Sequence, residues 1–340
     1  MNIRDYLINS WYSHSAFLPY FLWPFSQMYK FIIYLRKKFI KPVQFDIPVI
    51  IVGNITVGGT GKTPLVIWLA KFLRKNNYRP GIVSRGYGGK TKIYPQQIFP
   101  TSDPNEVGDE AVLLARRAKC PVIIDPDRVN AVRYLLNNTD CNIVISDDGL
   151  QHYALGRNIE IAVIDGHRRF GNRWCLPAGP LREPITRMDS VDFIVTNGGE
   201  IGVGEIGMKL IPGKIYNLSD TTLKANLDDF AGEAVHAIAG IGNPERFFDF
   251  LRELKLSIWP HRFPDHYHYS PKDINFKDDA KIIMTEKDAV KCEVFADYRY
   301  WCLPIDAELE KDFGEKVLKL INLTPATRTL SCEKEREKRK

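Results

Sequence analysis

The residues with the clearest chemical potential lie between positions 56 and 63, where glycines surround a lysine and a threonine. An apolar stretch, residues 49–52, precedes this turn, and an apolar pattern with helical spacing follows it over residues 64–75. Glycines allow backbone N–H groups to converge on an anion, and the N-terminus of a helix adds its dipole. A lysine and a threonine at the end of such a turn reach the β- and γ-phosphates of ATP and ligate Mg²⁺. The pattern therefore predicts an ATP-binding P-loop made of Thr56, Val57, Gly58, Gly59, Thr60, Gly61, Lys62 and Thr63.

One position departs from the usual P-loop pattern. Thr56 stands where that pattern has its first glycine. Gly58 and Gly59 keep the turn flexible, so we retain the prediction. The alternative is a glycine-rich turn with a chance Lys-Thr pair.

Two adjacent carboxylates, Asp147 and Asp148, follow a second apolar stretch, residues 143–146. In a P-loop protein an acid at this point supports Mg²⁺, so Asp147 is the predicted metal-binding aspartate. Asp125 and Asp165 end similar stretches, so this feature alone does not single out Asp147. Residues 147–152 read Asp-Asp-Gly-Leu-Gln-His, which adds an acid, an amide and an imidazole where open α/β sheets bind ligands. We therefore expect this cluster to be functional.

Three further loops carry polar side chains. Residues 84–89 offer a cation and an aromatic ring on a flexible loop, and residues 177–184 form a proline-rich, charged one. Asp109 opens a predicted helix, where an acid also serves simply to cap the helix. The histidines of residues 261–268 lack a nearby cysteine and helical H-x-x-x-H spacing, which disfavours zinc. The candidates for contact with a substrate are Arg85, Tyr87, Glu110, Asp148, His152 and Arg182.

These loops need a scaffold of alternating strands and helices. Short apolar stretches separated by helical patterns are typical of buried parallel strands, so we expect an α/β fold with a doubly wound, mostly parallel P-loop sheet. A glycine-rich stretch near residue 204 indicates a boundary, after which a second, smaller α/β unit begins. The predicted division is an N-terminal amphipathic helical segment (1–45), a P-loop domain (46–204), a smaller C-terminal α/β domain (205–330) and a charged tail (331–340).

The first 45 residues combine many aromatic side chains with six basic residues and a single acidic one. Aromatic rings flanked by Lys and Arg are typical of a helix that lies in the membrane interface. Pro19 and Pro24 interrupt the apolar pattern, so no run of about 20 apolar residues remains and a single N-terminal span is disfavoured. A helix that only covers the core is the other alternative.

Composition narrows the remaining classes. The 340 residues carry a net charge of +6, concentrated at the N-terminus, and the six cysteines form no C-x-x-C pair. This argues against a zinc ribbon or a disulfide scaffold and is typical of a reducing cytosol. We expect neither a nucleic-acid partner nor an obligate protein partner.

Several motifs in a fixed order give the chain a family resemblance. It resembles the tetraacyldisaccharide 4′-kinases, the lipid A 4′-kinases of Gram-negative bacteria, from its aromatic N-terminus to about residue 305. Ala111 and Leu150 replace a proline and a phenylalanine that are frequent in that family. The motifs that carry the resemblance lie at residues 57–64, 84–88, 107–110, 147–152, 176–184, 263–266 and 285–288.

The resemblance implies transfer of the γ-phosphate of ATP to the 4′-hydroxyl of a tetraacylated glucosamine disaccharide 1-phosphate, which gives lipid IVA. It implies Asp109 as the base, aided by His266, with Lys62 and Asp147 among the catalytic residues. It further implies Mg²⁺ held by Thr63, Asp147 and Glu183. The lipid substrate implies a peripheral position on the cytoplasmic face of the inner membrane.

A membrane-associated P-loop ATPase switch is the alternative function. Such switches carry a lysine just before the two glycines, where this chain has Val57. A GTPase would need Asn-Lys-x-Asp, which the sequence lacks.

Overall fold

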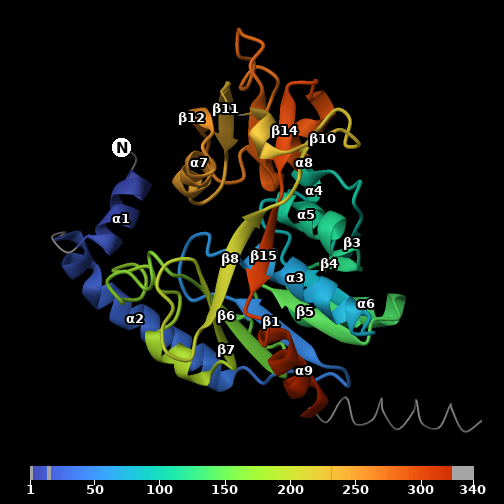
Figure 1. Cartoon of the computed structure of the whole chain (residues 1–340). Helices are drawn as coiled ribbons and strands as arrows, with labels where there is room; N and C mark the ends of the chain where they lie inside the picture. Colours follow the sequence, from blue (N-terminus) through green and yellow to red (C-terminus); the bar gives the residue numbers. More distant parts are fainter. Residues whose placement is uncertain (1–2, 14–16, 231, 324–340) are drawn as a thin grey trace, which may run out of the picture.

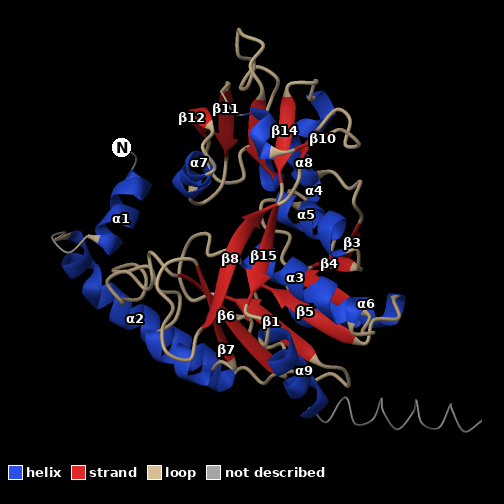
Figure 2. Cartoon of the chain, viewed as in Figure 1, coloured by secondary structure: helices blue, strands red, loops and turns tan. Residues whose placement is uncertain are grey.

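The computed structural model of the protein describes residues 3–13, 17–230 and 232–323. It contains a nine-stranded and a six-stranded sheet, each with helices packed against it. Figure 1 shows the smaller sheet beyond one end of the larger, and Figure 2 shows loops gathered between α2 and the larger sheet. The predicted α/β class with a mostly parallel sheet is confirmed.

The larger sheet is parallel from β4 across to β8, with antiparallel strands at both edges. Its order is β15-β8-β7-β6-β1-β5-β2-β4-β3. The strands are β1 (Val49–Gly53), β2 (Pro80–Ser84), β3 (Gln96–Ile98), β4 (Val122–Ile124), β5 (Ile143–Asp147), β6 (Ile159–Asp165), β7 (Phe193–Asn197), β8 (Ile206–Pro212) and β15 (Ile305–Leu309).

Strand β1 shows why the central strands read as continuous apolar runs. Successive side chains of a strand point to opposite faces. Ile50 and Val52 pack into a core with helices α3 (Lys62–Lys75), α5 (Asp109–Ala118) and α9 (Phe313–Leu323). Val49 and Ile51 pack into a second core with α6 (Arg128–Asn138). Both faces are therefore covered, and the polar loops at the strand ends rest on a rigid layer.

The second sheet is smaller and mixed. Its order is β10-β9-β14-β13-β11-β12, and β14, β13, β11 and β12 run parallel. Helix α7 (Pro244–Glu253) packs on one face and α8 (Glu286–Cys292) on the other. The strands are β9 (Ile215–Asn217), β10 (Lys224–Ala225), β11 (Ala234–Ala239), β12 (Ser257–Arg262), β13 (Ile282–Thr285) and β14 (Tyr300–Leu303).

Strands β8 and β15 pair antiparallel and lead between the two sheets (Figure 1). Both belong to the larger sheet, although both follow residue 204, and α9 packs on the larger sheet's core. The chain thus leaves the larger sheet, builds the smaller one and returns. The predicted division at residue 204 stays a prediction. The strands of the smaller sheet lie in the sequence between β8 and β15 of the larger sheet. The remaining helices are α4 (Pro104–Val107) and the short 3₁₀ turns Ile185–Ser190, Leu227–Phe230 and Glu293–Phe295.

The N-terminal segment forms α1 (Ile3–Tyr12) and α2 (Leu18–Phe39). Helix α2 continues through Pro24, so the prolines interrupt the apolar pattern without ending the helix. The Ser26 hydroxyl donates to the carbonyl of Cys175 at 2.7 Å. Within the described ranges, no helix has the length and apolar character needed to cross a bilayer. The predicted charged tail, 331–340, lies outside the described residues.

Candidate active site

The P-loop connects β1 to α3 by a turn that a side chain would obstruct. Gly61 caps α3 with a φ of 91°, a left-handed conformation that favours glycine. A Cβ at Gly61 would also collide with Asn197 Nδ2, which donates to the Thr60 carbonyl at 2.9 Å. Asn197 ends β7 and was not among the predicted residues, because nothing in its local sequence reports a contact with a turn so far away in the chain.

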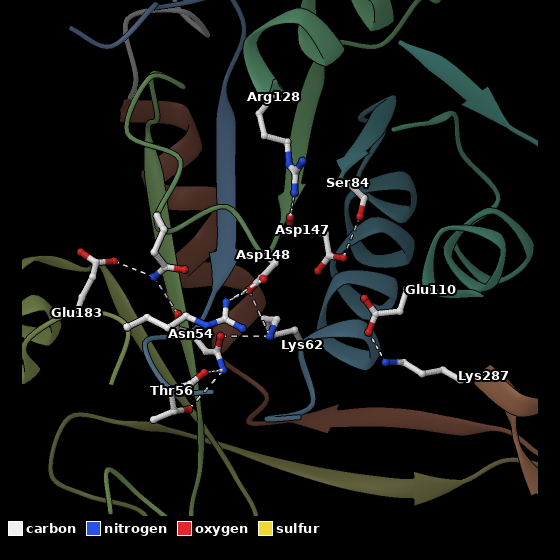
Figure 3. A network of polar contacts seen from close by, with 12 residues as sticks. Asn54, Thr56, Lys62, Ser84, Glu110, Arg128, Asp147, Asp148, Glu183 and Lys287 are labelled. Atoms are coloured by element: carbon white, nitrogen blue, oxygen red, sulfur yellow. Dashed lines mark hydrogen bonds and ion pairs between the residues drawn. The ribbon is translucent and has the colours of Figure 1, made fainter. Parts of the chain in front are cut away.

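Lys62 begins α3 and points back over the P-loop (Figure 3). Its Nζ lies 3.3 Å from Asp148 Oδ1 and 3.2 Å from Asn54 Oδ1. Asn54 directly follows β1, is fully buried and donates to the Thr56 carbonyl at 2.8 Å. This amide thus connects the lysine to the residue that replaces the first P-loop glycine, a role that sequence reasoning missed.

The two adjacent aspartates sit in opposite electrostatic environments. Asp148 has a φ of 49° and faces Lys62 and Arg182, whose Nη1 lies 3.0 Å from Oδ2. Burial opposes its ionisation, but these two cations outweigh burial and hold the pKa of Asp148 well below its usual range. Asp147 is buried at the end of β5, where burial, Glu110 and Asp148 raise its pKa.

Asp147 also has spare capacity for a ligand. Ser84 Oγ donates to its Oδ2 at 3.4 Å, and its Oδ1 has no hydrogen-bond partner among the described residues. A buried carboxylate oxygen without a donor is suited to a cation, and Mg²⁺ takes oxygen ligands. Thr63 directly follows Lys62 in the first turn of α3 and is buried as well. These groups fit a Mg²⁺ site that phosphate and water oxygens would complete.

Glu183 lies apart from that pair. Gln151 Nε2 donates to its Oε1 at 2.8 Å, and Arg187 Nε lies 3.3 Å from its Oε2. Figure 3 shows Glu183 on the far side of Asn54 from Asp147. Across the described part of the chain, no three His, Cys, Asp or Glu side chains are grouped to hold a metal by themselves.

A second group of site residues forms where α5 meets the second sheet. Asp109 is the first residue of α5 and is 3% exposed. His266 Nδ1 lies 3.0 Å from Asp109 Oδ1, which also accepts the backbone N–H of Glu110 at 2.8 Å. The hydrogen bond to Asp109 raises the pKa of His266, while burial opposes the rise. Asp109 is thus more than a helix cap, because its side chain reaches a residue of the other sheet's loops.

Most of the other predicted substrate residues contact one of these two groups. The Tyr87 ring packs edge-on against His266, with centroids 4.9 Å apart, and Arg85 is exposed at the end of β2. Glu110 forms an ion pair with Lys287 of α8 (Figure 3). His152 lies apart, because its Nε2 accepts the backbone N–H of Arg128 at 3.2 Å. Arg128 was not predicted, although it is buried and donates to the carbonyl of Asp147 at 3.3 Å.

A P-loop at the carboxyl end of β1, with an acid at the end of the neighbouring strand β5, defines the class of P-loop phosphotransferases and NTPases. The family model described as "Tetraacyldisaccharide-1-P 4'-kinase" matches residues 18–322. The chain therefore belongs to the tetraacyldisaccharide 4′-kinase family.

The alignments with similar proteins cover almost the whole chain. A tetraacyldisaccharide 4′-kinase of Nitrosococcus oceani is 52% identical over 320 residues, which cover 93% of this chain and 94% of that protein. One of Methylobacillus flagellatus is 48% identical and covers 92% of this chain and 95% of that protein. A crystal structure of LpxK from Aquifex aeolicus in complex with ATP matches with a TM-score of 0.74 and 28% identity, over 89% of this chain and 99% of that one.

Proposed function

We infer that this chain is a kinase that transfers the γ-phosphate of ATP to the 4′-hydroxyl of a tetraacylated glucosamine disaccharide 1-phosphate, forming lipid IVA in lipid A biosynthesis. The family match over residues 18–322 is the observation that carries this conclusion. Relatives at about half identity bear the name of this activity, and the LpxK structure was determined with ATP.

We propose that the P-loop, residues 56–63, binds the ATP phosphates, with Lys62 at the β- and γ-phosphates. Thr63 and Asp147 would hold Mg²⁺, and the unpartnered Asp147 Oδ1 supports that assignment. The proposal for Glu183 requires that it exchange its contacts with Gln151 and Arg187 for the ion. Bound Mg²⁺ supplies neutralisation of the charge on the β- and γ-phosphates.

We propose that the 4′-hydroxyl proton passes to the pair formed by Asp109 and His266, with Asp109 as the acceptor. Their contact at 3.0 Å supports this role. The pKa of Asp109 lies well below its usual range, because His266, Lys287 and Lys291 outweigh the opposing effect of burial. A weak base suffices here, because the hydroxyl proton is lost late in a loose phosphoryl-transfer transition state.

The remaining residues would position the substrates. Arg85 and Tyr87 lie on one exposed loop, and the Tyr87 ring packs against His266. A cation and a ring at this place could meet the sugar or its phosphate. Asp148 forms ion pairs with both Lys62 and Arg182. We therefore assign Asp148 and Arg182 to the positioning of Lys62 at the ATP phosphates. Glu110 and His152 would act through their contacts with Lys287 and Arg128.

The N-terminal helices would hold the enzyme at the cytoplasmic face of the inner membrane. Helix α2 exposes large aromatic side chains along its length, and its last turn carries Arg36, Lys37 and Lys38. This combination supports peripheral binding at an anionic interface. The most exposed aromatic residues of this helix and its first flank are Phe17, Tyr20, Phe21, Phe31, Tyr34 and Phe39.

The direct test is incubation of the protein with ATP, Mg²⁺ and a tetraacylated disaccharide 1-phosphate, followed by mass spectrometry of the lipid. The expected product carries one additional phosphate at the 4′ position. A membrane-associated ATPase switch would instead hydrolyse ATP without the lipid and leave the lipid unchanged, which would contradict the proposal.

A further inference from the structure

A buried lysine lies behind the proposed base, and only its charge has entered the function described above. Lys291 belongs to α8, and its side chain is 3% exposed. Its Nζ lies 3.3 Å from Asp109 Oδ2 and 3.3 Å from Asp288 Oδ1, and 5.1 Å from the centre of the Tyr269 ring. The ammonium has no hydrogen-bond partner among the described residues. Burying an ammonium costs desolvation free energy unless an opposite charge compensates it. The two carboxylates, Asp109 and Asp288, provide that compensation.

Asp288 is already satisfied by other donors. Its Oδ2 accepts the backbone N–H of Gly240 at 3.0 Å and the Thr285 hydroxyl at 2.7 Å. Its Oδ1 accepts the Tyr269 hydroxyl at 2.9 Å. Asp288 therefore has enough neutral partners to be held in place without an ammonium. Lys291 is then the bridge between this fixed carboxylate and Asp109.

Asp109 Oδ2 has a different neighbourhood from Oδ1. His266 and the Glu110 backbone N–H both approach Oδ1, and Lys291 approaches Oδ2. The charged or titratable groups that face this carboxylate are His266 from the loop after β12, Lys287 and Lys291 from α8, and the Tyr269 ring. Lys287 is engaged with Glu110, whereas Lys291 makes a direct ion pair with Asp109.

We propose that Lys291 is a positioning residue that keeps Asp109 ionised and aligned with His266. The inference rests on the proposed role of Asp109 as proton acceptor. Asp109 lies on the larger sheet's side of the site, whereas both side chains that contact its oxygens, His266 and Lys291, come from the smaller sheet's side. The smaller unit therefore contributes an electrostatic contact to the base as well as an imidazole.

Loss of the Lys291 charge should change the pKa of Asp109 in a predictable direction. A nearby cation favours the ionised carboxylate and burial disfavours it, so the pKa of Asp109 rises when the cation is removed. Activity that needs ionised Asp109 is lost as pH falls through that pKa. The acid limb of the kcat profile must therefore move to higher pH.

The test compares Lys291→Met, Lys291→Arg and the double variant Asp288→Asn/Lys291→Met with wild type in the lipid phosphorylation assay. Lys281→Met is the matched control, because Lys281 also lies in the smaller unit and pairs 2.9 Å away with Glu233. For Lys291→Met we expect kcat at neutral pH to fall about tenfold to a hundredfold. We expect its acid limb to rise by about one pH unit or more, with the KM for ATP unchanged. Arginine should restore most of the wild-type profile.

The double variant separates positioning from structural pairing, and also serves if Lys291→Met does not fold. It removes the ammonium together with its second carboxylate, so the shifted acid limb should persist. A wild-type profile in the double variant would mean that Lys291 only compensates Asp288, and would overturn the inference. So would an unshifted limb in folded Lys291→Met. Failure of wild type and Lys281→Met to phosphorylate the lipid would instead refute the proposed function.

Discussion

At the scale of single residues, the site is organised by pairing each buried charge with a specific partner. Lys62 is shared between Asp148 and Asn54, and Asp109 is held between His266 and Lys291. Asp147 keeps an oxygen without a hydrogen-bond partner among the described residues. Ionised groups arranged in advance of the reaction stabilise developing charge without reorganisation.

Lys62→Ala should abolish phosphoryl transfer and leave the fold intact. Lys62 is the P-loop's cation, and its loss removes charge stabilisation at the β- and γ-phosphates, so we expect kcat to fall by about 10²-fold or more. Asp148 keeps Arg182 as a partner, which limits damage to the fold. Lys71→Ala on the same helix, whose ammonium pairs with Asp306 at 3.1 Å, is the control. Near-normal turnover by folded Lys62→Ala would rule out the P-loop assignment.

Asp109 and His266 should behave as one unit in a double-mutant cycle. Each alanine variant should lose most activity, and the double variant should lose little more. The reason is that mutational effects on log rate are not additive for residues that act together. The KM for ATP should change little. If Asp109 only capped α5, its variant would lose about 0.5–2 kcal/mol of stability and keep its activity. Steady-state rates with unfolding curves distinguish these outcomes, and fully additive losses in log rate would mean that the two residues do not cooperate.

The same pair should make stability depend on pH in one direction. The hydrogen bond with Asp109 raises the pKa of His266 above its unfolded value of about 6.5. Its contribution to stability is therefore complete below that unfolded value and is lost as pH rises through the folded pKa. Denaturant unfolding should show a stability gap between wild type and His266→Gln that narrows from acid to alkaline pH. A gap that widens over this range would contradict the raised pKa.

At the scale of elements, the sequence predicted the local helices and strands, but it did not predict the contacts between distant segments. The central strands and the helices α3, α5 and α6 were predictable, because apolar runs and helical spacing are properties of a few adjacent residues. The pairing of β8 with β15 was not, because it joins segments separated by the whole smaller sheet. Likewise the P-loop could be identified from its motif, whereas Asn197 and Lys291 reach the site only through tertiary packing.

Two P-loop glycines should differ sharply in their tolerance to alanine. At Gly61 a Cβ would meet Asn197, and the φ of 91° is unfavourable for any side chain. We expect Gly61→Ala to lose about 1–3 kcal/mol or more in unfolding free energy. At Gly59 nothing lies within 4 Å of the added Cβ, so Gly59→Ala should fold with nearly unchanged stability. Thermal unfolding of both variants is the measurement, and equal losses would show that Asn197 does not constrain the turn.

At the scale of the whole molecule, three parts of the chain meet around one site. The larger sheet supplies the P-loop and Asp147, and the loops and helix of the smaller one supply His266 and Lys291. The N-terminal helices also reach this region. The Tyr29 hydroxyl of α2 donates to the Arg182 carbonyl at 3.2 Å, and Tyr12 of α1 lines a small recess with P-loop residues 56–60. The helices that we propose to bind the membrane surface thus contact the loops of the candidate site directly.

The N-terminal segment should bind membranes peripherally and raise the local concentration of lipid substrate without taking part in the chemistry. Each exposed Lys or Arg near an anionic surface contributes about 1 kcal/mol to binding, and this contribution weakens with salt. Replacing the exposed Lys37, Lys38 and Lys41 by Gln should therefore shift the protein from vesicles to the soluble fraction. Activity should fall on substrate in bilayers and fall less on substrate dispersed in detergent.

The matched control replaces three exposed lysines of the smaller unit, Lys224, Lys272 and Lys277, by Gln. It makes the same change in net charge away from α2, so binding that depends on the N-terminal segment should persist. Equal losses in bilayers and detergent for the α2 variant would indicate a catalytic or folding role for the segment. High salt should release part of the wild-type protein, while the exposed rings of Phe21 and Phe31 retain the rest through burial in the interface. Resistance to both salt and alkaline carbonate would instead require a membrane-spanning segment, and peripheral binding through α2 would then be wrong.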